Sequence, residues 1–74
     1  MDRLPILSGR EIVNILGVAG YEIVRRRGSH IRLSCPERKS VTVPDYKTVS
    51  RGLLVKILRD ARISHDDFIR LYKT

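Results

Sequence analysis

Three β-prone runs follow one another between Tyr21 and Val43, and this succession constrains the fold more than any other feature of the sequence. The runs are Tyr21 to Arg26, Ser29 to Ser34 and Ser40 to Val43. Arg27–Gly28 and a loop over Cys35–Lys39 connect them, and neither connection has room for the crossover of about a dozen residues that parallel neighbours require. The sequence therefore predicts an antiparallel meander of three strands.

Amphipathic helix patterns lie on both sides of the meander. Ser8 to Glu11 reads as a capping box, in which the serine hydroxyl and the glutamate carboxylate satisfy backbone N–H groups of a first turn. We expect a helix from about Gly9 to Ala19, ended by Gly20, with the apolar stripe Ile12, Ile15, Leu16 and Ala19. Ser50 is the expected N-cap of a second helix, with the stripe Leu53, Leu54, Ile57, Leu58 and Ala61.

The remaining segments complete the expected architecture. Ser64 is the expected N-cap of a short last helix with Phe68, Leu71 and Tyr72, and Met1 to Leu7 form a short arm. The sheet face that receives the two longer helices is Tyr21, Ile23, Ile31, Leu33, Val41 and Val43. The opposite, mostly polar and cationic face is Glu22, Val24, Arg26, His30, Arg32 and Thr42. The order α-β-β-β-α-α therefore predicts a two-layer α+β sandwich, with the helices on one face of the sheet and a single domain over residues 1–74.

The charge balance suggests a polyanionic partner. The chain has 15 Lys and Arg against 8 Asp and Glu in 74 residues, a net charge of +7. Most of these cations are arginines, whose guanidinium groups bind phosphate in a bidentate geometry. Nucleic acid is therefore a candidate partner, although charge alone fits a merely soluble basic protein equally well. No apolar run approaches the ~20 residues that cross a bilayer, so we expect a cytoplasmic protein without a membrane partner.

One histidine lies within the densest group of cations. Six of the fifteen cations fall around His30: Arg25, Arg26, Arg27, Arg32, Arg38 and Lys39. Gly28 allows a close approach of backbone to ligand, and Ser29 adds a hydroxyl. An imidazole among cations suffices for RNA cleavage without a metal, because the base takes the 2′-hydroxyl proton and the cations stabilise the charge that develops at phosphorus.

Simpler interpretations of the same residues stay open. A histidine in a strand is more often an ordinary surface residue, and a run of cations is often a solvated face or a plain phosphate grip. His65 is expected to be structural or functionally neutral, since the start of a helix disfavours a positive imidazole. Cys35 is the single cysteine and is expected to be incidental, so we expect no disulfide, metal or cofactor.

Several segments in order resemble a known family. They are Ala19-Gly20-Tyr21, Arg27-Gly28-Ser29-His30, Val43-Pro44, Arg51-Gly52-Leu53-Leu54 followed by Ile57-Leu58, and Ser64 to Phe68. The Gly-Ser-His step is weak by itself, but the ordered set, which spans roughly Leu7 to Phe68, is specific. On this basis the chain is similar to the HicA toxins.

The resemblance implies a fold, an activity and a partner. HicA-like proteins have a fold like that of double-stranded-RNA-binding domains and act as mRNA interferases, which are metal-independent endoribonucleases that arrest growth. The resemblance makes His30 the catalytic residue. It implies neutralisation by a HicB-like antitoxin, which covers the active site in a hetero-oligomeric complex.

Two positions depart from the family pattern. Tyr46 stands where many relatives have a second histidine, two residues after the Val-Pro pair, so Tyr46 or water would protonate the leaving group. Tyr46 and Lys47 join the expected RNA-binding residues, which otherwise are Arg25, Arg26, Arg27, Gly28, Ser29, Arg32, Arg38 and Lys39. Arg62 stands where the family tends to have glycine after the second helix, and would be strained in a left-handed conformation.

Two other functions remain compatible with the sequence. A non-catalytic RNA-binding module would hold A-form RNA by its shape and its phosphates. A partner-binding protein would present the same cations to an acidic antitoxin surface, which does not exclude nuclease activity.

Overall fold

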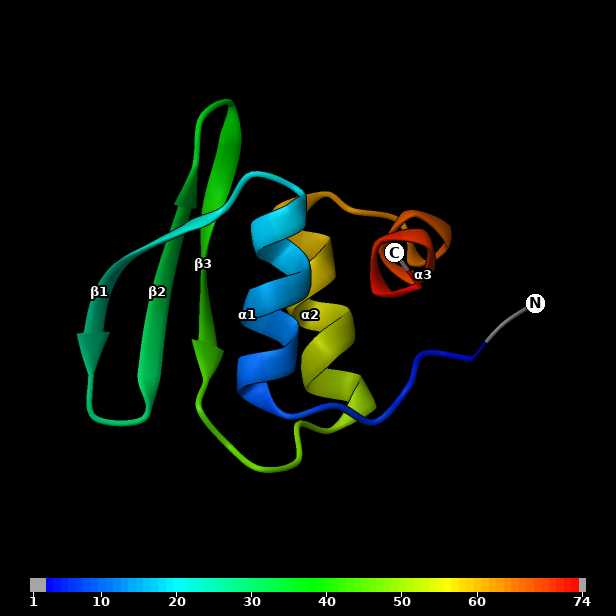
Figure 1. Ribbon diagram of the computed structural model, residues 1–74, viewed down its shortest axis with the longest axis horizontal. Coiled ribbons are helices and arrows are strands. Elements are labelled where there is room, and N and C mark those ends of the chain that lie inside the picture. Colours follow the sequence, from blue (N-terminus) through cyan, green and yellow to red (C-terminus); the bar gives the residue numbers. More distant parts are fainter. Residues whose placement is uncertain (1–2, 74) are drawn as a thin grey trace.

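The computed structural model describes residues 3–73 and contains three helices and three strands within that range (Figure 1). The elements in chain order are α1 (Gly9–Val18), β1 (Glu22–Arg27), β2 (His30–Cys35), β3 (Arg38–Pro44), α2 (Arg51–Ala61) and α3 (His65–Tyr72). The strands form one antiparallel sheet in the order β1-β2-β3. The predicted α+β architecture and its order of elements are therefore confirmed.

The helix boundaries follow from local caps. The Ser8 hydroxyl accepts from the Glu11 N–H at 3.1 Å, and the Glu11 carboxylate accepts from the Ser8 N–H at 2.9 Å. At the other end of α1, Gly20 has φ +108° and the Tyr21 N–H donates to the carbonyl of Leu16 at 3.1 Å. This hydrogen bond is typical of the Schellman motif, in which the residue after the C-cap is left-handed. Glycine is favoured there because a residue with a Cβ would pay about 1 kcal/mol or more to adopt that conformation.

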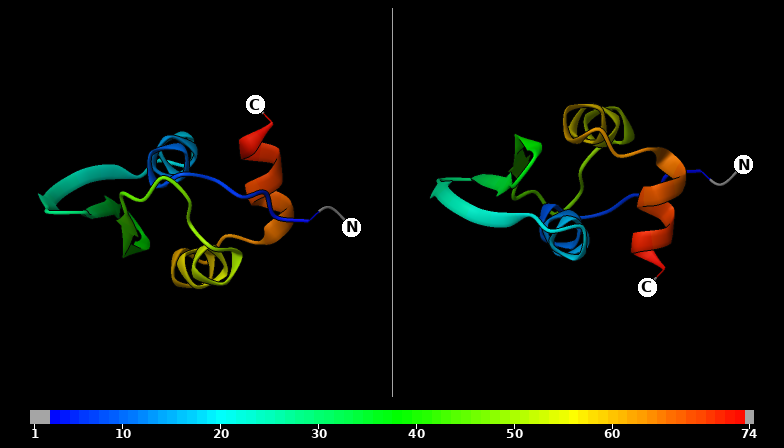
Figure 2. Two further views of the ribbon diagram at one scale, coloured as in Figure 1. Left: turned by 90° about the horizontal axis from the view of Figure 1, so that it is seen from below. Right: turned by 90° about the horizontal axis from the view of Figure 1, so that it is seen from above.

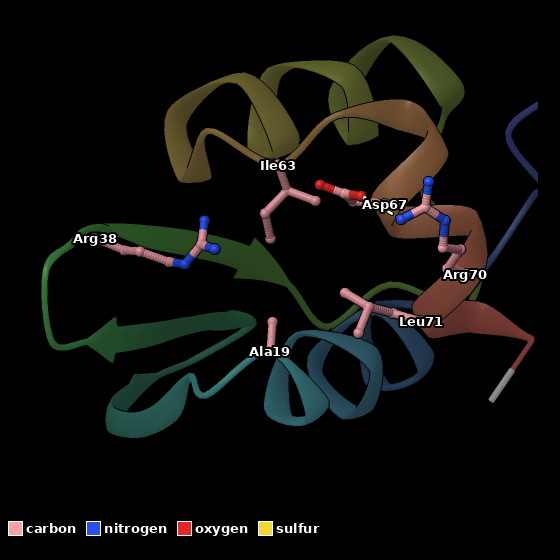
Figure 3. A pocket seen from close by; sticks show the side chains of 6 residues that line it. All are labelled: Ala19, Arg38, Ile63, Asp67, Arg70 and Leu71. Atoms are coloured by element: carbon pink, nitrogen blue, oxygen red, sulfur yellow. Dashed lines mark hydrogen bonds and ion pairs between the residues drawn. The ribbon is translucent and has the colours of Figure 1, made fainter.

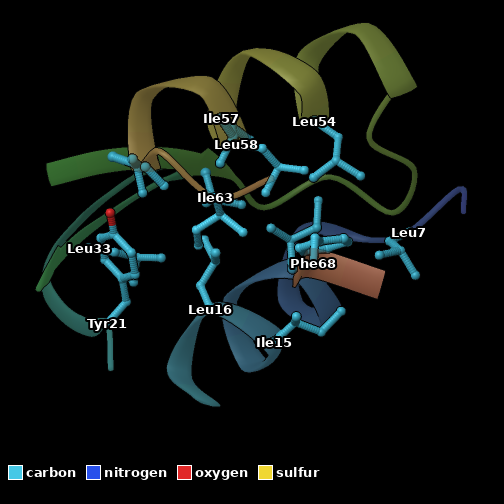
Figure 4. Close-up of a cluster of buried hydrophobic side chains, with 14 of the residues drawn as sticks. Leu7, Ile15, Leu16, Tyr21, Leu33, Leu54, Ile57, Leu58, Ile63 and Phe68 are labelled. Atoms are coloured by element: carbon cyan, nitrogen blue, oxygen red, sulfur yellow. The ribbon is translucent and has the colours of Figure 1, made fainter. Parts of the chain in front are cut away.

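The hydrophobic core lies between the sheet and the two longer helices, which lie side by side (Figure 2). β3 packs against both α1 and α2, and α3 lies on the far side of the helix pair from the sheet (Figures 1 and 2). Phe68 of α3 is fully buried and points between α1 and α2, with Leu54 on one side and Ile15 on the other (Figure 4). The two helices therefore receive apolar side chains from the sheet and from α3.

A β-bulge in β1 corrects the predicted assignment of its faces. Ile23 pairs with Leu33 and Arg26 with Ile31, while the register shifts between Ile23 and Arg25. Cross-strand partners project to the same face of a sheet, so Arg26 lies on the helix-facing side, not on the outer face as the alternation predicted. The extra residue inserted by the bulge shifts every following side chain of the strand to the opposite face.

The predicted burial of Ile23 is also wrong. The bulge leaves Ile23 on the helix-facing side of the sheet, but its side chain is 54% exposed. Every residue of β1 is exposed, because β1 is the edge strand farthest from α1 and α2 (Figure 1). The core face of the sheet therefore consists of residues from β2 and β3, with Tyr21 just before β1.

The second hairpin is longer than the sequence predicted. Cys35 pairs with Arg38, so only Pro36 and Glu37 form the turn, and Arg38 and Lys39 belong to β3 rather than to a loop. Glu37 accommodates the tight turn with φ +66°. Antiparallel pairing extends the strands as far as the turn permits, which the loop-like composition of this segment conceals.

The N-terminal arm packs against the start of α2. Leu4 and Leu7 are buried, and Leu7 forms an isolated antiparallel bridge with Val49. The Arg51 guanidinium donates to the Leu4 carbonyl at 2.6 Å. Residues 1 and 2 of the predicted arm lie outside the described residues. Among residues 3–73, no helix is long and apolar enough to span a membrane.

Candidate functional site

His30 lies at the start of β2, directly after the turn that joins β1 to β2. Gly28 has φ +57° in this turn, a conformation that glycine adopts without the steric cost of a Cβ. His30 pairs with Arg27 of β1 and with Pro44 of β3, and it is exposed. Its imidazole is therefore accessible on the outer face of the sheet, at the end where the chain turns.

Three arginines share that outer face with His30. Arg27 is the direct cross-strand neighbour of His30, and Arg25 is that of Arg32. His30 and Arg32 are two residues apart on one strand, and such residues project to the same side at a spacing of roughly 7 Å. The Arg32 guanidinium donates to the Thr42 hydroxyl at 2.9 Å, which directs it across β3. The outer face thus combines a titratable imidazole with a cluster of guanidinium groups.

Asp45 connects the His30 turn to the start of α1. Its backbone N–H donates to the Ser29 carbonyl at 2.6 Å. Its carboxylate, 19% exposed, forms ion pairs with Arg26 and, at 3.4 Å, with Arg10. Arg26 belongs to β1 and Arg10 to α1. Asp45 therefore links β1, α1 and the turn before His30 at this end of the sheet. Arg26 is consequently paired with a carboxylate, on the face opposite to the imidazole.

The N-terminus of α1 packs tightly against the same loop. The Gly9 N–H donates to the Tyr46 carbonyl at 2.8 Å, and a Cβ on Gly9 would lie 1.9 Å from the Pro44 carbonyl oxygen. This close approach keeps the loop after β3 beside the His30 turn. Tyr46 and Lys47 are exposed there, and they line a hollow of about 320 Å³ together with Ser8, Arg10 and Asp45.

Arg38 and Lys39 lie away from His30, at the opposite end of β2 and β3. Six residues of β2 separate the two ends, which is about 17 Å of strand. The Arg38 guanidinium donates to the Ala61 carbonyl at 3.0 Å, at the C-terminus of α2. Figure 3 shows Arg38 extending toward a hollow of about 320 Å³ that Asp67 and Arg70 of α3 line from the other side. These two cations and His30 therefore cannot contact one phosphate.

The other titratable candidates lie outside this group. His65 is the exposed first residue of α3, which is separated from the sheet by α1 and α2 (Figure 1). Cys35 is buried, and its sulfur lies near Gly20, where an added Cβ would be 3.3 Å away. Within residues 3–73 there is no group of three or more His, Cys, Asp or Glu side chains placed to hold a metal ion.

Sequence reasoning did not identify three residues that organise the site. Asp45 holds the turn before His30, Arg10 ties α1 to Asp45, and Thr42 accepts from the Arg32 guanidinium. None of the three was among the expected site residues. Asp45 had a usable signal, because it is an acid directly after Val-Pro in a strongly basic region. Thr42 had a weaker signal, because it shares the predicted outer face with Arg32. Arg10 had none, since its contact with Asp45 joins residues 35 positions apart.

A comparison with protein families finds a match over most of the chain. The family model described as the HicA toxin of bacterial toxin–antitoxin systems matches residues 9–63, which is most of the 74-residue chain and includes His30 and Asp45. No curated protein matches the chain.

Proposed function

This chain belongs to the HicA toxin family of bacterial toxin–antitoxin systems, and we propose that it is an endoribonuclease that cleaves mRNA through His30. The observation that carries the proposal is the exposed position of His30 on the outer face of the sheet, with Arg27 beside it across the strands and Arg32 two residues along. Imidazole is the side chain best suited to proton transfer near neutral pH. Guanidinium groups at the same place supply the electrostatic half of phosphoryl transfer.

The proposed reaction uses the substrate's own 2′-hydroxyl as nucleophile. His30, as a neutral imidazole, takes the proton of the 2′-hydroxyl, and the 2′-oxygen forms a bond to phosphorus. The bond between phosphorus and the 5′-oxygen of the next nucleotide breaks, and that oxygen takes a proton. The products are a 2′,3′-cyclic phosphate and a 5′-hydroxyl end. The reaction requires neither a metal ion nor a redox partner.

The arginines of the outer face have distinct proposed roles. Arg27 and Arg32 neutralise the extra negative charge on the phosphoryl oxygens in the transition state, since they are the cations nearest to His30 in register. Arg25 contacts a neighbouring phosphate and contributes to affinity. Gly28 and Ser29 form the turn that presents the imidazole. We assign the protonation of the leaving group to Tyr46 or to water.

The other expected RNA-binding residues take more distant roles in this proposal. Lys47 extends the phosphate path beyond Tyr46 along the loop, where it is exposed. Arg38 and Lys39 would meet RNA only if the strand runs the whole length of the sheet. Arg26 does not contact RNA in this proposal. Its guanidinium forms an ion pair with Asp45 and so helps to hold β1 beside the loop after β3.

The family implies an antitoxin partner, and we propose a HicB-like protein that forms a hetero-oligomeric complex and blocks access to His30. The net charge of +7 favours an acidic partner surface, which would compete with RNA for the same arginines. We place the activity in the cytoplasm, where mRNA is the available substrate.

A defined mRNA incubated with the purified protein in excess EDTA tests the proposal. We expect cleavage by the parent protein and a loss of about 10²- to 10⁴-fold in His30→Ala, the usual cost of removing a positioned acid–base group. His65→Ala is the matched control, since it removes the other histidine from an exposed position on α3. The upstream fragment should end in a 2′,3′-cyclic phosphate, and the downstream fragment should begin with a 5′-hydroxyl.

Each contrary result has a defined meaning. Equal cleavage by the parent and His30→Ala would exclude His30 as the acid–base residue. Cleavage abolished by EDTA would exclude the metal-independent mechanism. RNA that is shifted on a gel but left intact by every variant would favour the non-catalytic RNA-binding module instead.

A further inference from the structure

β1 leaves two adjacent apolar side chains uncovered. Ile23 is 54% exposed and Val24 is 59% exposed, although both lie in a strand of the sheet. β1 pairs only with β2, so its other edge presents backbone N–H and C=O groups without a strand partner among the described residues. Exposed apolar side chains beside a free strand edge are typical of interaction sites.

A hollow lies next to Ile23, between β1 and α1. It has a volume of about 380 Å³ and is lined by Arg10, Val13, Asn14, Ile23, Arg26 and Ile31. The register places Ile23 and Arg26 on the helix-facing side of the sheet, so the hollow opens on the face opposite to His30. Its lining combines the apolar residues Val13, Ile23 and Ile31 with the two arginines.

The charges around the hollow select the kind of occupant. Arg26 of β1 and Arg10 of α1 both line the hollow, and the single carboxylate of Asp45, which pairs with both, offsets only one of their two positive charges. A second copy of this chain would bring the same arginines against these and be repelled. RNA phosphates would pair with the arginines, but they would leave the apolar side chains of Ile23 and Val24 without an apolar partner. A protein segment with an apolar side chain flanked by carboxylates satisfies both features.

We propose that an acidic segment of the antitoxin docks on β1, with an apolar side chain of that segment in the hollow beside Ile23. This inference rests on the proposed antitoxin partner, but it does not depend on the nuclease mechanism. The docking surface is defined by Ile23, Val24 and the hollow. The hollow lies on the helix-facing side of the sheet, whereas His30 lies on the outer face, and the free edge of β1 separates the two. A segment anchored there would hold the antitoxin at the toxin while another part of it covers the outer face.

Isothermal titration of the HicB-like antitoxin into purified toxin variants tests this proposal. We expect the Ile23→Thr/Val24→Thr double variant to bind at least about tenfold more weakly, because roughly 1.4 kcal/mol of apolar burial corresponds to tenfold in affinity. Threonine preserves the β-branched shape and the strand preference. Val18→Thr is the matched control, since Val18 is also 59% exposed but lies at the end of α1.

The charge of the docking segment is tested by two further variants at one position. Ile23→Lys and Ile23→Glu both remove the apolar side chain and introduce a long charged one. With an acidic segment, the antitoxin should bind Ile23→Lys more tightly than Ile23→Glu, and the difference should shrink as salt is added. The reverse order would overturn the acidic partner.

RNA cleavage by the same variants separates this inference from the proposed function. The double variant, the Val18→Thr control and the two charged variants at Ile23 should all cleave RNA at the parent rate. Ile23 lies on the face opposite to the imidazole, and Val24 lies at the bulge. If the parent cleaves no RNA but binds antitoxin through Ile23, only the nuclease proposal fails. Unchanged antitoxin affinity in the double variant, or self-association of the parent that the double variant abolishes, would overturn the docking proposal.

Discussion

The backbone N–H of Asp45 donates a hydrogen bond to the carbonyl of Ser29 at 2.6 Å, which joins the end of β3 to the turn before His30. The carboxylate of Asp45 adds ion pairs to Arg26 and Arg10. The backbone bond fixes the turn on one side, and the carboxylate fixes β1 and α1 on the other. If His30 is the acid–base residue that we propose, Asp45 acts on it as a positioning residue, since its carboxylate pairs with Arg26, whose partner Ile31 marks the face opposite to the imidazole.

Asp45→Asn should lower RNA cleavage more than it lowers stability. The asparagine retains the backbone hydrogen bond and the size of the side chain but loses the charge that holds Arg26 and Arg10. Partly exposed ion pairs contribute about 0–1 kcal/mol, so the thermal midpoint should change little. Arg26 adjoins Arg27, the cross-strand partner of His30, so release of Arg26 disturbs the groups beside the imidazole. Misplacement of this kind costs about 10- to 100-fold in rate, and the loss should appear in kcat rather than in KM.

The control for Asp45→Asn is Asp67→Asn, which removes the charge of another carboxylate that forms an ion pair with an arginine. Asp67 pairs with Arg70 at 3.2 Å on α3, away from the sheet. The Asp67→Asn variant should cleave RNA at the parent rate. Parental kcat in Asp45→Asn, or equal losses in the two variants, would argue against a positioning role.

The features that sequence predicted well are those with local causes. The caps at Ser8, Ser50 and Ser64 all accept from the backbone N–H three residues later, as their spacing indicated. The apolar stripes of α1 and α2 are buried or partly buried, because helical periodicity directly encodes the face that packs. α2 ends in the left-handed conformation at Arg62, with φ +57°, which is the condition under which the sequence predicts strain at this residue.

The features that sequence did not predict depend on the neighbouring strand or on tertiary reach. Nothing in Tyr21 to Arg27 indicates a bulge, because strict alternation and bulged pairing use the same residue types. The bulge nevertheless decides which arginines accompany His30, namely Arg25 and Arg27 rather than Arg26. The exposure of Ile23 likewise depends on how far α1 and α2 extend over the sheet.

Gly9→Ala should destabilise the protein, whereas Gly17→Ala should stabilise it. A Cβ on Gly9 would lie 1.9 Å from the Pro44 carbonyl oxygen, a backbone atom that moves only if α1 shifts. Such overpacking costs about 1–3 kcal/mol. Gly17 is in the same helix with no atom within 4 Å of an added Cβ, so alanine should gain about 1 kcal/mol of helix propensity. Urea unfolding measures both, and equal effects would contradict the close packing at Gly9.

Arg62→Gly should raise stability by about 1 kcal/mol, because Arg62 carries a Cβ in a left-handed conformation with φ +57° at the end of α2. Arg62→Ala is the control, since both variants remove the cation from the helix end but only glycine relieves the backbone. The difference in unfolding free energy between the two variants isolates the strain. If the alanine variant is as stable as the glycine variant, the left-handed conformation carries no cost here.

Tyr21 should make stability decline at alkaline pH. Burial raises the pKa of the Tyr21 phenol above its ordinary value of 10.0, the charge of Cys35 raises it further, and the Arg38 cation partly opposes both. Its hydroxyl donates to the Lys39 carbonyl at 2.7 Å, a bond that exists only in the neutral form. The unfolded chain therefore loses the proton more readily than the folded one.

The sign of the effect follows from the raised pKa. The contribution of neutral Tyr21 is fully present below the unfolded pKa near 10, and it is lost as pH rises through the higher folded pKa. Tyr21→Phe lacks both the proton and the hydrogen bond, so at pH 8 it should be less stable than the parent by about 1 kcal/mol. Above pH 10 this difference should narrow, because only the parent continues to lose stability through this residue. Urea unfolding of both proteins at pH 8, 10 and 11 measures the difference, and a constant gap would show that Tyr21 does not titrate with a raised pKa in the folded state.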